Sequence, residues 1–139
     1  MPVIQYFQEK TRFKLPHPRK TSRWLLRVVK SEKNQAAGIN FIFCSDKYLK
    51  TINIEYLAHN TFTDVITFDY SDPTGIQGDI FISIERVREN AEKFQTNLDE
   101  EIHRVMIHGV LHLLGYTDKS KTAKALMRKK EDAYLSLRG

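Results

Sequence analysis

The sequence predicts an α+β protein in which a small mixed β-sheet of about four strands packs against about five helices. Runs rich in β-branched and aromatic residues, typical of strands, lie at 3–8, 39–44, 65–70 and 80–84. Segments between and after them carry apolar residues at helical spacing. The longest such segment is apolar almost all round, as expected of a central buried helix.

Size and composition narrow the possible classes of protein. The chain has 139 residues, of which 41% are hydrophobic and 28% charged, so residues 1–139 are expected to form one domain. No apolar run approaches the ~20 residues of a membrane span, and no signal-peptide pattern opens the chain, which favours a cytoplasmic protein without membrane contact. The single cysteine, Cys44, ends a strand-like run and is interpreted as a small buried hydrophobe rather than a nucleophile. A net charge of +5 is compatible with a polyanionic partner.

In the first half, a strand at 3–8 precedes a helix that Pro18 or the residues after it can open. Its apolar stripe is formed by Trp24, Leu25, Val28 and Val29. Residues 39–44 are predicted to be a buried strand. Ser45 is a suitable N-cap for the helix that follows.

In the second half, the strands 65–70 and 80–84 are separated by a short loop with turn residues, which predicts an antiparallel pair. A helix over 85–95 would turn Val87, Ala91 and Phe94 inward. Asn97 to Glu100 has the form of a capping box, which starts the central helix. The last helix, about 121–136, is expected to pack through Ala123, Leu126, Met127, Ala133, Tyr134 and Leu137.

The central helix carries two histidines, His108 and His112, one turn apart on the same face. The same spacing lets the outer histidines of the HExxH motif share a zinc ion, but Gly109 replaces the glutamate of that motif. Gly115 can end the helix and let the chain fold Asp118 back toward both histidines. The three side chains are therefore candidate metal ligands.

A single histidine on an apolar face is usually a hydrogen-bonded core residue, and His103, off the ligand face, is interpreted as a surface or supporting residue. Two histidines at this spacing are harder to explain in that way, because each buried imidazole needs a partner. Two histidines and one carboxylate also leave a coordination position open, which is typical of a catalytic site.

The sequence around the two histidines resembles the motif of a known family. HGVLHLLGY is similar to the H-G-x-L-H-L-x-G-Y-D-H signature of the YbeY family, bacterial metal-dependent endoribonucleases of ribosomal RNA maturation. TDVITF at 63–68 and GDIFIS at 78–83 resemble two further family strands, and Leu49, Asn53 and Tyr56 match part of a family helix. The motifs keep their order over roughly residues 38–135.

The resemblance implies a single metallohydrolase domain and a single-strand-specific endoribonuclease. Its expected roles are maturation of the 3′ end of small-subunit rRNA and ribosome quality control. His108, His112 and Asp118 would hold one divalent ion, Zn2+ being the expected metal, and act through a water that the ion binds. The implied partners are single-stranded or ribosomal RNA, the small ribosomal subunit and its assembly proteins.

Two positions depart from the family pattern. Asp118 replaces a histidine as the third ligand, and a carboxylate can serve as a zinc ligand. Leu57 replaces a basic residue, so another cation would have to contact substrate phosphate. The candidates are Arg104, Lys119 and Lys121. The general base is not assigned, and the two aspartates considered for it, Asp64 and Asp79, are more simply explained as caps at the starts of strands.

Two other functions remain compatible with the sequence. One is a non-catalytic ribosome-assembly factor with a structural metal, which the changes at Leu57 and Asp118 would favour. The other is a metallohydrolase of a different substrate class, such as peptides. Lysines and arginines cluster at 12–27 and, directly after the motif, at 119–130. These basic segments and the absence of the HExxH glutamate argue against that second alternative.

Overall fold

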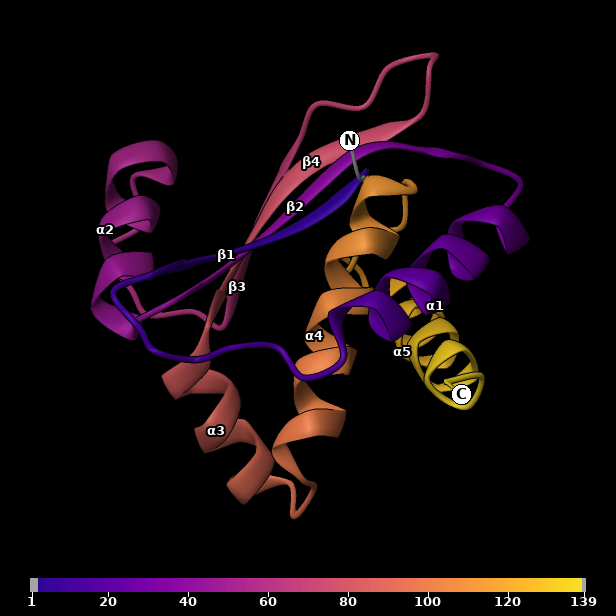
Figure 1. Ribbon diagram of the computed structural model, residues 1–139. Helices are drawn as coiled ribbons and strands as arrows, with labels where there is room; N and C mark the ends of the chain where they lie inside the picture. Colours follow the sequence, from indigo (N-terminus) through magenta and orange to yellow (C-terminus); the bar gives the residue numbers. More distant parts are fainter. Residues whose placement is uncertain (1–2, 139) are drawn as a thin grey trace.

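Strands and helices alternate over the first half of the chain, and helices alone make up its C-terminal part. The computed structural model describes residues 3–138, whose elements are β1 (Ile4–Glu9), α1 (Pro18–Ser31), β2 (Ala36–Cys44), α2 (Asp46–Leu57), β3 (Val65–Asp69), β4 (Ile76–Ser83), α3 (Ile84–Lys93), α4 (Leu98–Leu113) and α5 (Lys121–Leu135). Within this range, five helices and a four-stranded mixed sheet confirm the predicted class (Figure 1). The expected single domain also includes residues 1–2 and 139, which lie outside the described residues.

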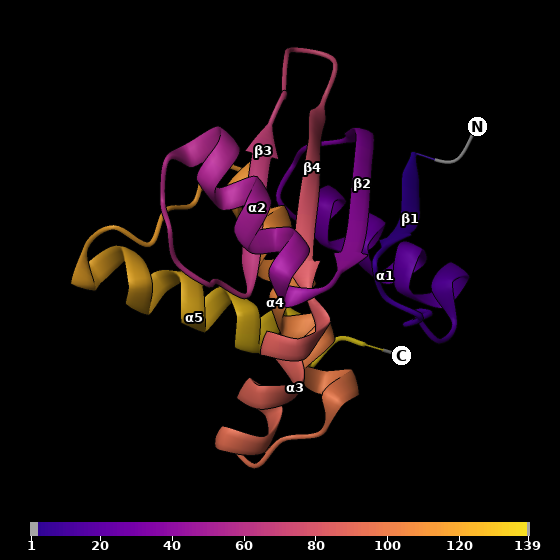
Figure 2. The ribbon, with the colours of Figure 1, turned by 90° about the vertical axis from the view of Figure 1, so that its left-hand side faces the viewer.

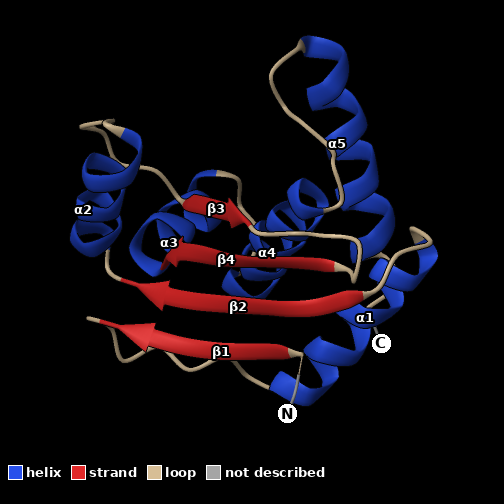
Figure 3. Cartoon of the chain, turned by 90° about the horizontal axis from the view of Figure 1, so that it is seen from above, coloured by secondary structure: helices blue, strands red, loops and turns tan. Residues whose placement is uncertain are grey.

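The strands lie side by side in the order β1-β2-β4-β3 (Figure 3). β1 and β4 each run parallel to β2, and β3 runs antiparallel to β4, which confirms the predicted antiparallel pair. In that pair Val65 lies opposite Ile82, so β3 begins beside the end of β4. The backbone N–H of Ser83 donates to the carbonyl of Asp64 over 2.9 Å and holds the start of β3 there.

Helices cover both faces of the sheet. α1 and α4 pack on one face and enclose the main core, while α2 covers the opposite face (Figure 2). The smaller core beneath α2 contains Cys44, Leu49, Ile52 and Ile66. Burial, with the nearby carboxylates adding to it, raises the pKa of the Cys44 thiol to about 12, in agreement with a packing role.

The central helix α4 is buried along most of its length, as predicted. The Asn97 side chain accepts a hydrogen bond from the N–H of Glu100 over 2.7 Å and caps its first turn. Gly109 faces the sheet so closely that a Cβ atom there would lie 2.8 Å from Cγ2 of Ile80. The glutamate of an HExxH motif at position 109 would therefore point into the sheet.

Alanine at Gly109 is expected to lower the free energy of unfolding by about 1–3 kcal/mol, because the added methyl group overpacks the contact with Ile80. The loss should occur although alanine favours a helix over glycine by roughly 1 kcal/mol. Urea unfolding measures it, with Gly38→Ala as the matched control, because a Cβ at Gly38 has no neighbour within 4 Å. Equal midpoints for Gly109→Ala and wild type would contradict the close packing.

Some expected boundaries and orientations are wrong. β4 starts earlier than expected, and Ile84 already belongs to α3, because the Ser83 hydroxyl accepts from the N–H of Arg86 and caps that helix. Val87 and Ala91 point inward, but α3 ends before Phe94, whose side chain at its C-cap is 59% exposed.

The inner face of α5 is also different. Its buried residues are Met127, Glu131, Tyr134 and Leu135, whereas Leu126, Ala133 and Leu137 are exposed. The expected stripe did not include Glu131. In the structure this side chain is buried and paired with Arg104 and His108 of α4.

Candidate metal centre

The two histidines of α4 face one another. Nε2 of His108 lies 3.0 Å from Nε2 of His112, and their ring centroids are 4.6 Å apart. Both rings are half-buried near the C-terminal end of the helix. The one-turn spacing thus brings two candidate ligand nitrogens together, as the sequence predicted.

The chain returns to this point directly after α4. Gly115 adopts a φ of 102°, a conformation that favours glycine, and the segment after it brings Asp118 back. Oδ2 of Asp118 lies 3.4 Å from Nε2 of His108 and 3.6 Å from Nε2 of His112. The three candidate ligand atoms all lie within 4.8 Å of one another and could hold a metal ion.

Each histidine is oriented through its other ring nitrogen. Nδ1 of His108 donates to Oε2 of Glu131 over 2.7 Å, and Nδ1 of His112 donates to the carbonyl of Tyr116 over 3.1 Å. Because both Nδ1 atoms carry a proton in these bonds, both Nε2 atoms present lone pairs toward Asp118. Metal-ligating histidines usually have such partners, so the donor set fits a divalent cation.

The partners of the histidines are themselves held in place. Nη1 of Arg104 donates to Oε1 of Glu131 over 3.0 Å, and Nη2 donates to Asp132 over 2.7 Å. The hydroxyl of Tyr116 donates to Oε1 of Glu32 over 2.6 Å. The same Glu32 carboxylate also accepts hydrogen bonds from Lys130 and Tyr134. Contacts from α5 and from the end of α1 therefore hold both histidine rings.

Charges around the site shift its pKa values in different directions. Burial lowers the pKa of His108, but the hydrogen bond and charge of Glu131 outweigh it, so the pKa is raised overall. Burial and the neighbouring His108 lower the pKa of His112. Burial raises the pKa of Asp64, although backbone hydrogen bonds and the charge of His108 oppose this effect. A proton and a cation would therefore compete for the same lone pair, that of Nε2 of His108.

Two pockets meet at the candidate ligands. One of about 530 Å³ lies beside the loop that carries Asp118, and one of about 400 Å³ lies between α3, α4 and α5. His108, Asp118, Asp64 and Val65 line both pockets. A substrate that extends over the ligands can therefore occupy space on either side of them.

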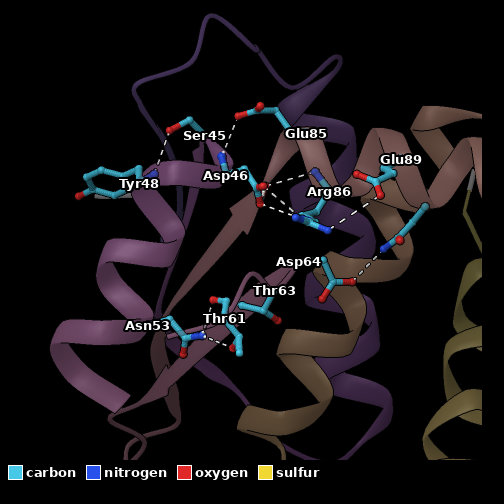
Figure 4. A network of polar contacts seen from close by, with 12 residues as sticks. Ser45, Asp46, Tyr48, Asn53, Thr61, Thr63, Asp64, Glu85, Arg86 and Glu89 are labelled. Carbon is cyan, nitrogen blue, oxygen red and sulfur yellow. Dashed lines mark hydrogen bonds and ion pairs between the residues drawn. The ribbon is translucent and has the colours of Figure 1, made fainter. Parts of the chain in front are cut away.

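The two aspartates considered as general bases lie in different places. Asp64 lies at the start of β3 and accepts a hydrogen bond from the Asn90 amide over 3.2 Å (Figure 4). The Asp79 carboxylate accepts from the Asn40 amide over 3.0 Å on the neighbouring strand, and it lines neither pocket. Of the two, Asp64 alone has access to the site.

The basic candidates are also placed differently. Arg104 lines the smaller pocket but is paired with Glu131 and Asp132, whereas Lys119 and Lys121 line neither pocket. Leu57 ends α2 with 43% of its surface exposed and does not line these pockets either. The smaller pocket is also lined by two cations of α5 that were not predicted to contact phosphate, Lys124 and Arg128.

Comparison with known proteins assigns the chain to a family. The sequence model of one family, described as Endoribonuclease YbeY, matches residues 3–138. The chain belongs to the YbeY family. The resemblance first noted in the HGVLHLLGY segment is thereby confirmed, and it extends over nearly all of the chain.

Several YbeY proteins are similar over most of their length. A protein of Amoebophilus asiaticus named Endoribonuclease YbeY is 50% identical over 133 residues, which are 95% of this chain and 90% of that protein. The Endoribonuclease YbeY of Flavobacterium psychrophilum is 57% identical over 114 residues, 82% of this chain and 81% of the relative. A solution structure of a Thermotoga maritima protein matches with a TM-score of 0.69 and 29% identity, covering 96% of this chain and 87% of that one.

Several features of this YbeY site were not predicted. Glu131 was not predicted. It lies four residues after Met127 and three before Tyr134, a spacing that places it on the inner face of α5 and could have indicated a role. The role of the Tyr116 carbonyl could not be predicted, because every residue has a backbone carbonyl. His103 lies away from the ligands, as expected, with its ring packed 5.4 Å from that of Trp24. No helix among residues 3–138 has the length and apolar character needed to cross a bilayer.

Proposed function

We propose that this chain is a single-domain metallo-endoribonuclease that cleaves single-stranded RNA in ribosomal RNA maturation, with Zn2+ as its metal. The observation that carries the proposal is the convergence of His108, His112 and Asp118, with both histidines oriented through Nδ1, in a chain whose relatives are named endoribonucleases. Two imidazoles and one carboxylate suit zinc and leave a position open.

His108, His112 and Asp118 would hold the ion at the point where the two pockets meet. When bound, the ion would act as a Lewis acid that polarises a phosphoryl oxygen of the substrate and lowers the pKa of a water molecule bound to it. Glu131 and the Tyr116 carbonyl keep the histidine rings in the binding orientation. Asp64, a carboxyl with a raised pKa that lines both pockets, is positioned to exchange a proton with the substrate.

The proposal includes a cellular setting. The substrate is the 3′ end of small-subunit rRNA, the process includes ribosome quality control, and the partners are the small subunit and its assembly proteins in the cytoplasm. The net charge of +5 supports a polyanionic partner.

Removal of the metal tests the activity. Purified protein treated with a chelator should lose cleavage of an unstructured RNA oligonucleotide, and stoichiometric Zn2+ should restore it. Metal content by mass spectrometry and product length on a gel are the measurements, with a double-stranded RNA as the control substrate. Full cleavage by protein shown to contain no metal would contradict the proposal.

A further inference from the structure

The smaller pocket at the candidate metal centre is a cleft with α4 as its floor. α4 packs against α3 on one side and α5 on the other (Figure 1). From α3 and its C-cap the cleft is lined by Asn90 and Phe94, and from α5 by Lys124, Met127, Arg128 and Glu131. His108 and Asp118 also line it. The cleft between the two helices therefore includes two of the three candidate ligands.

One wall of the cleft carries an exposed aromatic ring. Phe94 is 59% exposed, and Nζ of Lys93 lies 5.5 Å from its ring centroid. Exposure alone does not indicate a function, since Tyr70 is 58% exposed on a turn away from both pockets. Phe94 differs in lining a pocket that also contains candidate metal ligands.

The opposite wall carries two cations, Lys124 and Arg128, one turn apart on α5. Neither forms an ion pair with any residue among 3–138. The third cation of the cleft, Arg104, is already paired with Glu131 and Asp132. Lys124 and Arg128 therefore keep their charges available for a ligand.

Four carboxylates line the cleft: Asp118 is a candidate ligand, and the other three accept hydrogen bonds from neighbouring residues. Oε2 of Glu131 accepts from His108, Glu101 accepts from the Thr96 hydroxyl over 3.3 Å, and Asp64 accepts from Asn90. The larger pocket is different, because its lining contains threonines, aspartates and the histidines but no lysine or arginine. Among the residues that line the two pockets, the available positive charge therefore lies on the α5 side of the candidate ligands.

We infer that this cleft is a nucleotide subsite, in which an unpaired RNA base stacks on Phe94 while phosphates beside the scissile bond contact Lys124 and Arg128. The inference rests on the endoribonuclease activity proposed above. Stacking on an aromatic ring combined with cations along the backbone is the usual means of holding single strands without reading sequence. An unpaired base is required, because a base within a duplex cannot reach the ring. The phosphate contacts would thus lie on one side of the candidate ligands, the side of α5.

Steady-state cleavage of a single-stranded RNA by the metal-loaded protein tests the subsite. Phe94→Ala should raise KM about tenfold, within the range for losing one base–aromatic stack, and leave kcat nearly unchanged. Phe94→Trp should restore KM, and Tyr70→Ala, the matched exposed aromatic, should not change it. RNAs with one abasic nucleotide, placed in turn at each position around the cleavage site, should include one for which wild type and Phe94→Ala have equal KM.

Salt dependence tests the cationic wall. Lys124→Ala and Arg128→Ala should each reduce the slope of log kcat/KM against log salt by about 0.7, the value for one single-strand phosphate contact. Lys129→Ala removes the same charge from an exposed position of α5 outside the pocket lining and should leave the slope unchanged.

The outcomes separate the two proposals. The subsite is refuted, and the endoribonuclease proposal stands, if wild type cleaves RNA and Phe94→Ala has the same KM as wild type. The same holds if the rise in KM caused by Phe94→Ala is equal on every abasic RNA. Equal slopes for the Lys124 and Arg128 variants and for Lys129→Ala refute the cationic wall in the same way. If metal-loaded wild type does not cleave single-stranded RNA, the endoribonuclease proposal fails, and the subsite fails with it.

Discussion

Alanine at His108 or at His112 is expected to remove both the bound metal and the RNA cleavage. Each change deletes one of three candidate ligand atoms that lie within 4.8 Å of one another, and two remaining ligands would hold a divalent ion poorly. The loss of metal affinity should exceed the about 10- to 100-fold cost of removing an outer partner of a ligand. Metal content by mass spectrometry and cleavage of a single-stranded RNA measure the two effects.

His103→Ala is the matched control, because it removes an imidazole from the same helix at a place where the ring packs on Trp24 instead of facing the ligands. It should keep the metal. If His108→Ala and His112→Ala also retain metal and activity, the ligand assignment is wrong. If His112→Ala loses cleavage in the test tube but supports rRNA processing in cells as well as wild type, a non-catalytic assembly factor becomes the better description.

Glutamine at Glu131 is expected to lower metal affinity about 10- to 100-fold, because an amide orients the His108 imidazole less strongly than a carboxylate does. Alanine at the same position should in addition lower the free energy of unfolding by about 1–3 kcal/mol, since the half-buried Arg104 and His108 lose a hydrogen-bond acceptor. Competition with a chromophoric chelator measures the affinity, and urea unfolding measures the stability.

The neighbouring carboxylate provides the control. Asp132→Asn changes the other acceptor of Arg104 but leaves the bond between His108 and Glu131 in place, so metal affinity should stay at the wild-type value. A chelator competition in which Glu131→Gln matches wild type, or in which Asp132→Asn is equally weakened, would contradict a specific role for Glu131.

Local sequence patterns predicted much of this fold. Apolar spacing located the helices, the cap residues Ser45 and Asn97 located the starts of two of them, and the short turn predicted the antiparallel pair. The strand order was not predicted, because β4 pairs with β2 across a separation in the chain that no local pattern records. Such long-range pairing depends on the packing of the whole sheet.

The candidate site was predicted to a similar degree. The spacing of the histidines and the turn at Gly115 were sufficient to bring His108, His112 and Asp118 together. Glu131 was missed because a glutamate in an amphipathic helix normally faces water, and its partner lies 23 positions away. Phe94 was placed inward by helical spacing, which failed because the helix ends just before it.

The hydrogen bond between His108 and Glu131 connects α4 to α5 at the point where an ion would bind. A candidate ligand therefore takes part in the packing of the two helices. An ion held there also joins α4 to the segment after Gly115. An ion that binds only the folded chain shifts the unfolding equilibrium by mass action. Metal supply and conformational stability are then thermodynamically coupled, so a change that loosens α5 weakens metal retention, and scarcity of metal loosens α5.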